Sequence, residues 1–414
     1  ADDFTGASDI ASFLNLAGAR TILVNGIPEN SDYDYSAYDA VVIALKIRSI
    51  SSEKAVNYTK RAYNFLVNNK FSTVYFKYAS TFDSTEEGNI GPVSDYLLET
   101  IDQKYSVIVP SFPENNRTIK DGILYVNGKK IENTHMKNHP INPMTESKLS
   151  KLMESQSLYK AYNLSTDEIN YYLNHKKEFK DYISKLSNSH KHFYIIPDYY
   201  KNIHGKLISE LFSELNFYTG ASVFSGWVYQ KKNNIYQNEY PRLEKDKSDN
   251  IDLLKDGIIF AGSLSKATDK QIEKFKEYGY PFYEIKNEKI YKSYDNELKN
   301  IKKFIQINRE TPMLIYSERE KFHKAIGNLL ENIISEAALF ALKNNIKNLL
   351  TAGGETSGAV VKKIDFDNFE IGESISPGVP ILKVINAEVN LVLKSGNFGG
   401  KNFFVEALNI MEKY

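Results

Sequence analysis

Short apolar runs alternate with longer amphipathic segments through the first half of the chain. The runs are rich in β-branched residues and end at polar, glycine or proline positions, which is typical of buried strands. They fall at residues 20–26, 39–46, 72–80, 104–112 and 192–200. Residues 52–69 and 92–103 have the spacing of helices. Strands that alternate with helices predict a mostly parallel sheet covered on both faces.

The same alternation resumes in the last part of the chain and predicts a second unit of the same kind. Its strands, helices and strand–loop–helix successions fall at 256–265, 268–279, 311–318, 321–344, 346–361 and 389–414. Thr268 is placed to cap the first of these helices. Residues 229–256 are polar and lack apolar periodicity, which is typical of a linker or crossover. We therefore predict two α/β domains, 1–245 and 246–414, each with a mostly parallel sheet and helices on both faces.

Composition and charge exclude several classes of protein. The 414 residues include no cysteine, which rules out disulfide frameworks, cysteine-ligated zinc and cysteine nucleophiles. Lys plus Arg and Asp plus Glu both number 52, and this neutral balance argues against a general nucleic-acid binder. No apolar run reaches the roughly 18 residues that a membrane helix needs. We expect a cytoplasmic protein, with a homodimer as the default assembly.

Three glycine-containing loops follow predicted strands of the second domain, at residues 262–265, 353–358 and 394–400. Open α/β sheets bind ligands at the carboxyl ends of their strands. Glycine lets the backbone approach a ligand closely, and the N–H groups of a following helix attract anions. One such loop is as readily a tight turn. Three in one domain favour a phosphate or nucleotide site.

These loops do not match the common phosphate-binding patterns. Neither G-x-x-x-x-G-K-[ST] nor G-x-G-x-x-G occurs in the chain. Glu355 lies inside the second loop and would repel phosphate unless a cation sat between them, so Mg²⁺ is implied. The alternative is that Glu355 is an ordinary solvent-facing side chain.

Polar residues also gather at the strand ends of the first domain. They are Asp2, Asp3, Lys46, Arg48, Lys77, Ser80, Thr81, Asp83, Ser84 and residues 110–117. Acids, hydroxyls and a fork-shaped guanidinium together suit a small polyhydroxy acid. An arginine would hold its carboxylate, and an aspartate would take a proton from an attacking hydroxyl. Taken singly, each of these side chains is as readily a surface or capping residue.

His135 and His139 have H-x₃-H spacing, which on a helix could bind a metal. Pro140 and Pro143 favour a loop instead. We therefore favour substrate contact by His139 over metal ligation, and leave any metal ligands unassigned.

Seven segments in order along the whole chain resemble the four-carbon acid sugar kinase family, and most of all its 3-oxo-tetronate branch. They fall at 1–9, 80–93, 110–118, 139–149, 262–272, 353–361 and 375–400. Each motif alone is weak, but together they are specific. The length of the second and fourth segments resembles the 3-oxo-tetronate branch more than the threonate branch. Ala79 departs from the pattern, because relatives would carry cysteine there.

The resemblance implies an acid-sugar-binding domain, a nucleotide-binding domain and an active site in the cleft between them. It implies ATP-dependent phosphorylation of the C4 hydroxyl of a small-molecule acid sugar, 3-oxo-tetronate ahead of D-threonate or erythronate. ATP contacts would fall on Ser263, Ser265, Gly353, Gly354, Glu355, Thr356, Gly396 and Gly399. Substrate contacts would fall on Asp2, Arg48, Ser80, Thr81, Ser84, Arg117 and His139. Arg48 would bind the C1 carboxylate, and Asp3 or Asp83 would accept the proton.

Two other functions stay open from the residues alone. A phosphosugar isomerase or aldolase could use the glycine loops for a substrate phosphate and would need no nucleotide. A non-catalytic sugar-acid sensor could use a two-domain cleft, although it would not need three glycine loops in one domain. The kinase interpretation ranks above both.

The first residues suggest the end of a strand. In the family that the chain resembles, a strand precedes the segment that begins at Ala1. We expect about six to ten further residues upstream, mostly apolar, in keeping with usual strand lengths.

Overall fold

The chain forms two compact units. The computed structural model describes residues 1–28, 33–138, 142–235, 256–319 and 324–413. The units comprise Ala1–Thr21 with Gly26–Arg242, and Ile22–Asn25 with Leu243–Tyr414. The predicted boundary near residue 245 lies outside the described residues. No helix of the described segments is long and apolar enough to cross a bilayer.

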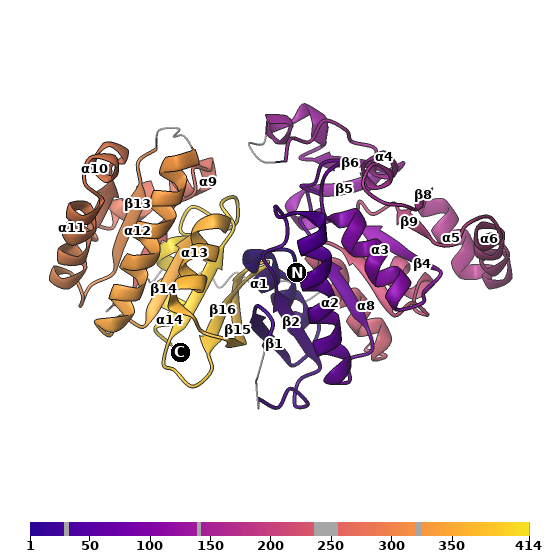
Figure 1. Ribbon diagram of the computed structural model, residues 1–414, viewed down its shortest axis with the longest axis horizontal. Coiled ribbons are helices and arrows are strands. Elements are labelled where there is room, and N and C mark those ends of the chain that lie inside the picture. Colours follow the sequence, from indigo (N-terminus) through magenta and orange to yellow (C-terminus); the bar gives the residue numbers. More distant parts are fainter. Residues whose placement is uncertain (29–32, 139–141, 236–255, 320–323, 414) are drawn as a thin grey trace. The chain divides into compact units, whose positions relative to one another are not determined.

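A five-stranded parallel sheet forms the centre of the first unit (Figure 1). Its strands, in spatial order, are β3 (Val74–Lys77), β10 (Phe217–Gly220), β4 (Tyr105–Val109), β9 (Phe193–Pro197) and β8 (Lys160–Leu164). Its strand residues are largely buried, as expected for a sheet that is covered on both faces. The predicted parallel α/β architecture is confirmed here.

The helices of the first unit pack on both faces of this sheet. They are α1 (Phe4–Leu16), α2 (Ser52–Asn68), α3 (Ile90–Thr100), α4 (Leu149–Glu154), α5 (Thr166–Asn174), α6 (Lys176–Ser189), α7 (Asn202–Leu211) and α8 (Ser222–Lys232). Phe76 and Ile108 share one buried cluster with Leu97 of α3. On the other face Phe224 of α8 packs against Tyr218, with ring centroids 6.2 Å apart. Because α8 runs to Lys232, the linker predicted from residue 229 begins too early.

Smaller elements complete the first unit. They are β2 (Ala40–Ala44), the antiparallel strands β5 (Arg117–Lys120), β6 (Ile123–Val126) and β7 (Lys129–Lys130), and 3₁₀ turns at Pro113–Asn115, Ile131–Asn133 and His135–Asn138. The backbone of Ala1 pairs with β2 and the residue after it as a parallel strand would. Its amino group donates to Ile43 O (2.9 Å), and its carbonyl accepts from the N–H of Leu45 (2.9 Å). A cavity of about 560 Å³ is lined by Ala1 and by residues of β2 and β3. The upstream strand stays a prediction.

The sheet of the second unit has a parallel half and an antiparallel half. The parallel strands are β12 (Phe282–Ile285), β13 (Met313–Ser317), β11 (Ile258–Ala261), β14 (Asn348–Ala352) and β17 (Asn390–Lys394). The antiparallel strands that continue it are β16 (Val379–Val384), β15 (Asn368–Ser376) and β1 (Thr21–Asn25). The sequence predicted the parallel strands other than β12. Of the antiparallel strands it predicted only β1, which it wrongly assigned to the first domain.

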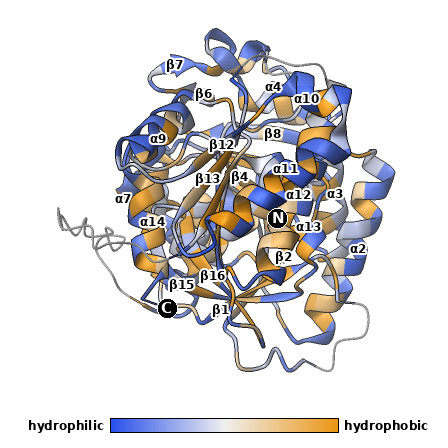
Figure 2. Cartoon of the chain, turned by 90° about the vertical axis from the view of Figure 1, so that its left-hand side faces the viewer, coloured by the Kyte–Doolittle hydropathy of each residue, from blue (hydrophilic) through white to orange (hydrophobic). Residues whose placement is uncertain are grey.

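Helices cover both faces of the second sheet as well. They are α9 (Lys266–Glu277), α10 (Asn287–Lys292), α11 (Tyr294–Ile307), α12 (Lys324–Lys343), α13 (Gly354–Ile364) and α14 (Phe403–Met411). Phe275 of α9 and Leu408 of α14 join the buried cluster of one face. On the other face Thr351 bonds to Ser357 of α13, Oγ to Oγ at 2.7 Å. Figure 2 shows the hydrophobic colour of β13 at the centre and mixed colours on α2, in line with this burial.

The predicted cap of α9 is wrong. Ser265, not Thr268, precedes the helix, and its hydroxyl accepts a hydrogen bond from the Thr268 N–H (3.2 Å). Serine in extended conformation at this position is a preferred N-cap. The Thr268 side chain is released from capping and donates instead to the carbonyl of Gly396 (3.0 Å).

Candidate active-site residues

The two acids at the start of the chain are held in different ways. The backbone of Asp2 bonds to Lys77 O at the end of β3 (3.0 Å) and to Ile47 N (3.1 Å), so it lies between the segments that follow β2 and β3. Asp3 caps α1: its carboxylate accepts the N–H of Gly6 at 2.7 Å. The acids therefore mark the carboxyl edge of the sheet and a helix start together.

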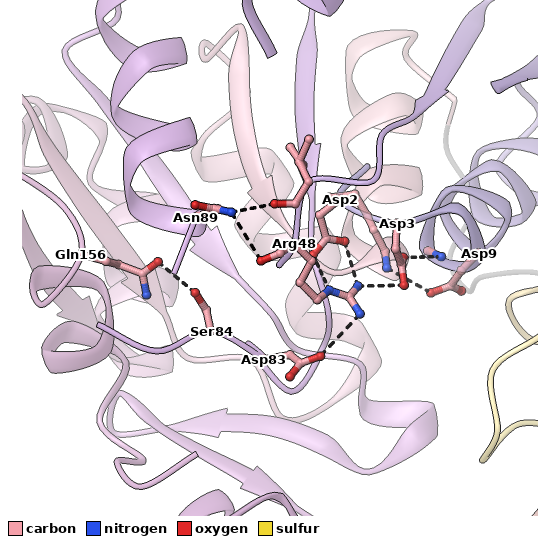
Figure 3. Close-up of polar contacts among 11 residues, drawn as sticks. Asp2, Asp3, Asp9, Arg48, Asp83, Ser84, Asn89 and Gln156 are labelled. Carbon is pink, nitrogen blue, oxygen red and sulfur yellow. Dashed lines mark hydrogen bonds and ion pairs between the residues drawn. The ribbon is translucent and has the colours of Figure 1, made fainter. Parts of the chain in front are cut away.

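Arg48 joins three carboxylates of the first unit (Figure 3). Its Nε and Nη2 atoms bind the two oxygens of Asp2 at 2.7 and 2.9 Å. Nη2 also lies 3.0 Å from Asp3 Oδ2, and Nη1 lies 3.4 Å from Asp83 Oδ2. The bidentate Asp2 pair is the geometry in which an arginine fork binds most strongly. Four residues predicted for the site thus meet at one guanidinium, which we call the Arg48 cluster.

Charge in the Arg48 cluster fixes the ionisation of its members. Burial by itself would lower the pKa of Arg48, but Asp2 and Asp3 outweigh it and raise that pKa above its usual value. Burial by itself would raise the pKa of Asp3, yet Arg48 and Lys77 lower it below its usual value. Arg48 and Asp3 are therefore both charged at neutral pH.

Asp83 is presented by a strained turn. Phe82 and Asp83 both have positive φ, 62° and 34°, a region that bulky residues rarely adopt. The ring of Phe82 is fully buried and packs edge-on against Tyr78, with centroids 5.6 Å apart. Such strain persists only where the surroundings hold it, and it gathers at functional sites. The turn points the Asp83 carboxylate at Arg48.

Two side chains that the sequence did not single out position this cluster. Asn89 is buried and donates through Nδ2 to the carbonyls of Ile47 (2.7 Å) and Ile50 (2.8 Å), on either side of Arg48. Gln156 Oε1 accepts from the hydroxyl of Ser84 (3.0 Å) and thereby holds the segment after Asp83. Isolated amides before a helix or in a loop have no distinguishing sequence pattern.

A second ionisable pair lies behind Asp3. Lys77, buried at the end of β3, has its Nζ 3.9 Å from Asp9 Oδ2 on α1, and Asp9 also accepts from the hydroxyl of Ser222 at 2.5 Å. Burial raises the pKa of Asp9 to about 6, although Lys77 and Ser222 oppose the rise. Asp9 gave no signal in the sequence because its place on a buried helix resembles that of an ordinary polar residue.

Other predicted substrate residues do not join the Arg48 cluster. Ser80 and Thr81 lie on the segment before Asp83, and no bond joins them to the cluster in the described segments. Arg117 begins β5; its Nη1 donates to Asn115 O, while its buried Nε has no partner among the described residues. Burial lowers the pKa of Arg117. His139 lies outside the described residues.

The predicted nucleotide residues come together in the second unit. Ser263, Ser265, Gly353, Gly354, Glu355, Thr356, Gly396 and Gly399 occupy three loops after β11, β14 and β17. These three strands are parallel neighbours, so their carboxyl ends meet at one edge of the sheet. The N–H groups of Gly262 and Ser263 bond to Ala352 O, and that of Gly353 bonds to Lys394 O.

Close packing of these loops requires glycine at two positions. Gly353 has a φ of 127°, and a Cβ there would lie 3.1 Å from the backbone nitrogen of Ser263. A Cβ on Gly396 would collide with the hydroxyl of the same serine. Gly353 also directly precedes α13, so a helix N-terminus lies at the junction of the three loops. The arrangement suits an anion.

The residues present could assist a metal but not cage one. No group of three or more acidic or histidine side chains is spaced for a metal ion within the ranges the structure describes. Mg²⁺ usually keeps several waters and takes one or two carboxylates together with substrate phosphates. Glu355, in the first turn of α13, is the carboxylate at the junction of the glycine loops that fits this role.

Comparisons with known families agree with the two units. A sugar-binding N-terminal domain matches residues 1–226, and a nucleotide-binding C-terminal domain matches residues 258–404. The solved structure of a Salmonella typhimurium LT2 protein superposes with a TM-score of 0.83 at 30% identity, covering 98% of this chain and 97% of the other. A Haemophilus influenzae structure does so with a TM-score of 0.76 at 32% identity, covering 99% and 98%.

Curated relatives carry the name 3-oxo-tetronate kinase. The Actinobacillus succinogenes protein is 34% identical over 98% of this chain and 97% of its own length, and the Brucella melitensis protein is 35% identical over 99% and 94%. A sugar-binding domain joined to a nucleotide-binding domain defines a carbohydrate kinase. The chain belongs to the four-carbon acid sugar kinase family, which confirms the resemblance noted from its motifs.

Proposed function

We propose that this enzyme transfers the γ-phosphoryl group of ATP to the C4 hydroxyl of 3-oxo-tetronate. The observation that carries the proposal is the Arg48 cluster, which gathers three carboxylates at the strand ends of the sugar-binding unit. Relatives of nearly equal length named 3-oxo-tetronate kinase support the choice of substrate. D-Threonate or erythronate is the alternative acceptor.

Asp83 is the general base in this proposal. It would take the proton of the C4 hydroxyl as the oxygen attacks the γ-phosphorus and ADP leaves. Asp3 is the other candidate, but both of its oxygens are engaged, one by the Gly6 N–H and the other by Arg48. Asp83 meets Arg48 only at 3.4 Å, so a shift of its carboxylate toward a hydroxyl gives up a weaker ion pair than a shift of Asp3 would.

The substrate carboxylate has two candidate partners. Arg48, the first candidate, already faces three carboxylates, and a fourth would have to displace one of them. Charge balance favours Arg117, because its buried Nε has no partner and its guanidinium makes no ion pair with a carboxylate among the described residues. Arg117 begins β5 after the loop that follows β4, and β4 lies two strand positions, about 10 Å, from β3.

The three glycine loops would hold the phosphates of ATP through backbone N–H groups. Ser263, Gly353, Gly354, Thr356 and Gly396 are the residues proposed to line them. Mg²⁺, when bound, would neutralise charge on the transferred group, with Glu355 as its protein carboxylate. Positioning and charge stabilisation of this kind account for most of the rate in phosphoryl transfer.

A coupled ADP-release assay over four-carbon acids tests the function. We expect 3-oxo-tetronate to give the highest kcat/KM and product phosphorylated at C4 by NMR. Equal or greater turnover of D-threonate or erythronate would reassign the acceptor, and no nucleotide-dependent turnover of any acid would sink the proposal.

Two variants assign the roles. D83N should lower kcat by about 100-fold or more while KM stays near wild type, in line with the loss of a general base. R117K should raise KM for the acid at least tenfold and change kcat little, because a lysine cannot form the fork. A wild-type kcat in D83N would assign the role of general base to Asp3. An unchanged KM in R117K would assign the binding of the substrate carboxylate to Arg48.

A further inference from the structure

The last residue of β17, Lys394, is an ammonium group buried without an acid. Its side chain is fully buried. Nζ donates to the carbonyls of Ser395 (2.9 Å) and Gly396 (2.8 Å) and lies 3.4 Å from the hydroxyl of Thr268. No carboxylate within the described ranges pairs with it. Burying an unpaired charge is costly, so its retention calls for a reason beyond packing.

The loop that follows Lys394 turns its carbonyls inward. Gly396 O accepts from Ser265 Oγ (2.6 Å) and Thr268 Oγ1 (3.0 Å) as well as from Lys394. Farther along the loop, the carbonyls of residues 398, 399 and 400 lie 3.1, 3.2 and 2.9 Å from Nε2 of Gln271, which is fully buried. Lys394, Ser265 and donors on α9 thus hold five carbonyls of residues 395–400.

Inward carbonyls dictate outward N–H groups. In a planar trans peptide the C=O and the following N–H point in opposite directions. The N–H groups that consequently face away from these donors belong to Gly396, Asn397, Gly399, Gly400 and Lys401. None of them donates to an acceptor in the part of the chain that the structure describes. Successive outward N–H groups form an anion-binding concavity.

We propose that Lys394 is a positioning residue of the nucleotide site: with Ser265, Thr268 and Gln271 it holds the loop 395–400 so that its N–H groups face the phosphates, and it places a positive charge behind them. This inference rests on the proposed function, in which the loop holds ATP. It adds a residue that touches no ligand and acts through the backbone.

Protonation of Lys394 is coupled to phosphate binding in this arrangement. Burial lowers its pKa to about 7. A bound polyanion favours the charged form, so nucleotide binding should draw a proton from solution above pH 7 and none near pH 6. The charged side chains on the neighbouring elements include Lys266 and Asp269 of α9, Glu355 of α13 and Lys401 after the loop. No charged side chain of α9 or α13 bonds to Nζ in the described segments.

Calorimetric titration of the full-length protein with ADP tests the inference. At pH 8, in Tris and in HEPES, whose ionisation enthalpies differ, the wild type should take up a fraction of a proton. K394M should bind ADP at least about tenfold more weakly with no proton uptake. K394R should recover most of the affinity, again with no uptake, because a guanidinium stays charged. K270M, an exposed lysine-to-methionine change on α9, is the matched control and should behave as wild type.

Several results would overturn the inference. They are wild-type ADP affinity in a folded K394M protein, or ADP binding by the wild type without proton uptake. If K394M does not fold, T268V provides the test, because it removes one donor to Gly396 O without a change of size. It should weaken ADP binding about threefold or more. Unchanged ADP affinity of T268V would contradict the inference. Failure of the wild type to bind any adenine nucleotide would instead refute the proposed function.

Discussion

At the scale of single residues, the acids near the start of the chain have unlike roles because their surroundings differ. Asp2 forms a bidentate pair with Arg48, and Asp3 caps a helix. Asp9 is buried beside Lys77 with a raised pKa. Three aspartates within nine residues thus serve as an ion-pair partner, a helix cap and a carboxyl group with a raised pKa.

Replacement of Asp9 tests whether its pKa is raised in the folded protein. The pKa of Asp9 is raised from 3.8 to about 6, so the folded protein binds this proton more tightly than the unfolded chain. The resulting stability is fully present below about pH 4 and is lost as the pH rises through 6. Relative to D9N, the wild type should therefore lose about 2 kcal/mol of unfolding free energy between pH 4 and pH 7. Urea titrations across this range measure the difference, and a flat difference would contradict the assignment.

Replacement of Asn89 tests whether this residue positions Arg48. N89A leaves the carbonyls of Ile47 and Ile50 without their donor. We expect about 2 kcal/mol less unfolding free energy and at least a tenfold loss of kcat/KM, since Arg48 lies between those carbonyls. N69A, which removes a bond to Phe65 O at the end of α2, is the matched control and should leave kcat/KM unchanged. Equal kinetic effects of the two variants would argue against a positioning role.

At the scale of elements, the glycine loops depend on backbone conformations that only their strands and helices impose. Gly353 adopts a φ of 127° where β14 turns into α13, and Gly358 lies within the same helix with open space around it. One glycine is required by the turn. The other is a weak helix former without a steric need.

Alanine at these two positions should have opposite effects. G353A forces a strained φ and crowds Ser263, so we expect loss of stability and at least tenfold weaker ADP binding. G358A should stabilise the protein by about 0.5 to 1 kcal/mol and leave ADP affinity unchanged. Thermal melting and calorimetry measure both variants. Normal ADP binding by G353A would show that the close approach of the loops is dispensable.

Strands were predictable where their signal is local. The run at 39–46 contains β2 and that at 104–112 contains β4, because a buried parallel strand is a continuous apolar stretch with clear ends. By contrast, β15 alternates exposed and buried residues and contains bulges, so no single run marks it. Of its two partners, β16 follows it directly, but β1 lies near the opposite end of the chain, and local pattern cannot reveal that pairing.

At the scale of the whole molecule, the division into units does not follow the chain. Residues Ile22–Asn25 belong to the second unit, where β1 pairs antiparallel with β15, Leu23 opposite Phe369. Asn25 adds side-chain and backbone bonds to Phe366 O (3.2 Å) and Asp367 O (2.8 Å). The second sheet thus depends on a strand from the opposite end of the chain.

A fragment of residues 246–414 tests this dependence. Without β1 it exposes the edge of β15, which presents unpaired backbone groups, and we expect poor solubility and a lower melting temperature. The same fragment with residues 20–26 joined through a flexible linker should recover both properties. Identical melting of the two fragments would mean that β1 adds no stability.

The predicted homodimer is tested separately by light scattering of the full chain.

The sequence predicted many of the site residues but not the contacts between them. Arg48, Asp83 and the three glycine loops stood out because polar residues and glycines at strand ends are the positions where α/β sheets bind ligands. That one guanidinium would meet Asp2, 46 residues away, together with Asp3 and Asp83, required the tertiary structure. The carbonyl-facing position of Lys394 was equally invisible, because strand periodicity indicates only that it is buried.

The sequence alone determined the α/β class, the parallel strands and the glycine loops, since burial periodicity and turn chemistry act between neighbours in the chain. Its ordered motifs also determined the family. The tertiary structure alone decided which carboxylates share Arg48, which donors turn a loop's carbonyls inward, and that residues 22–25 complete the second sheet. These features depend on contacts between distant segments, and such contacts are chosen by packing and charge in the folded molecule.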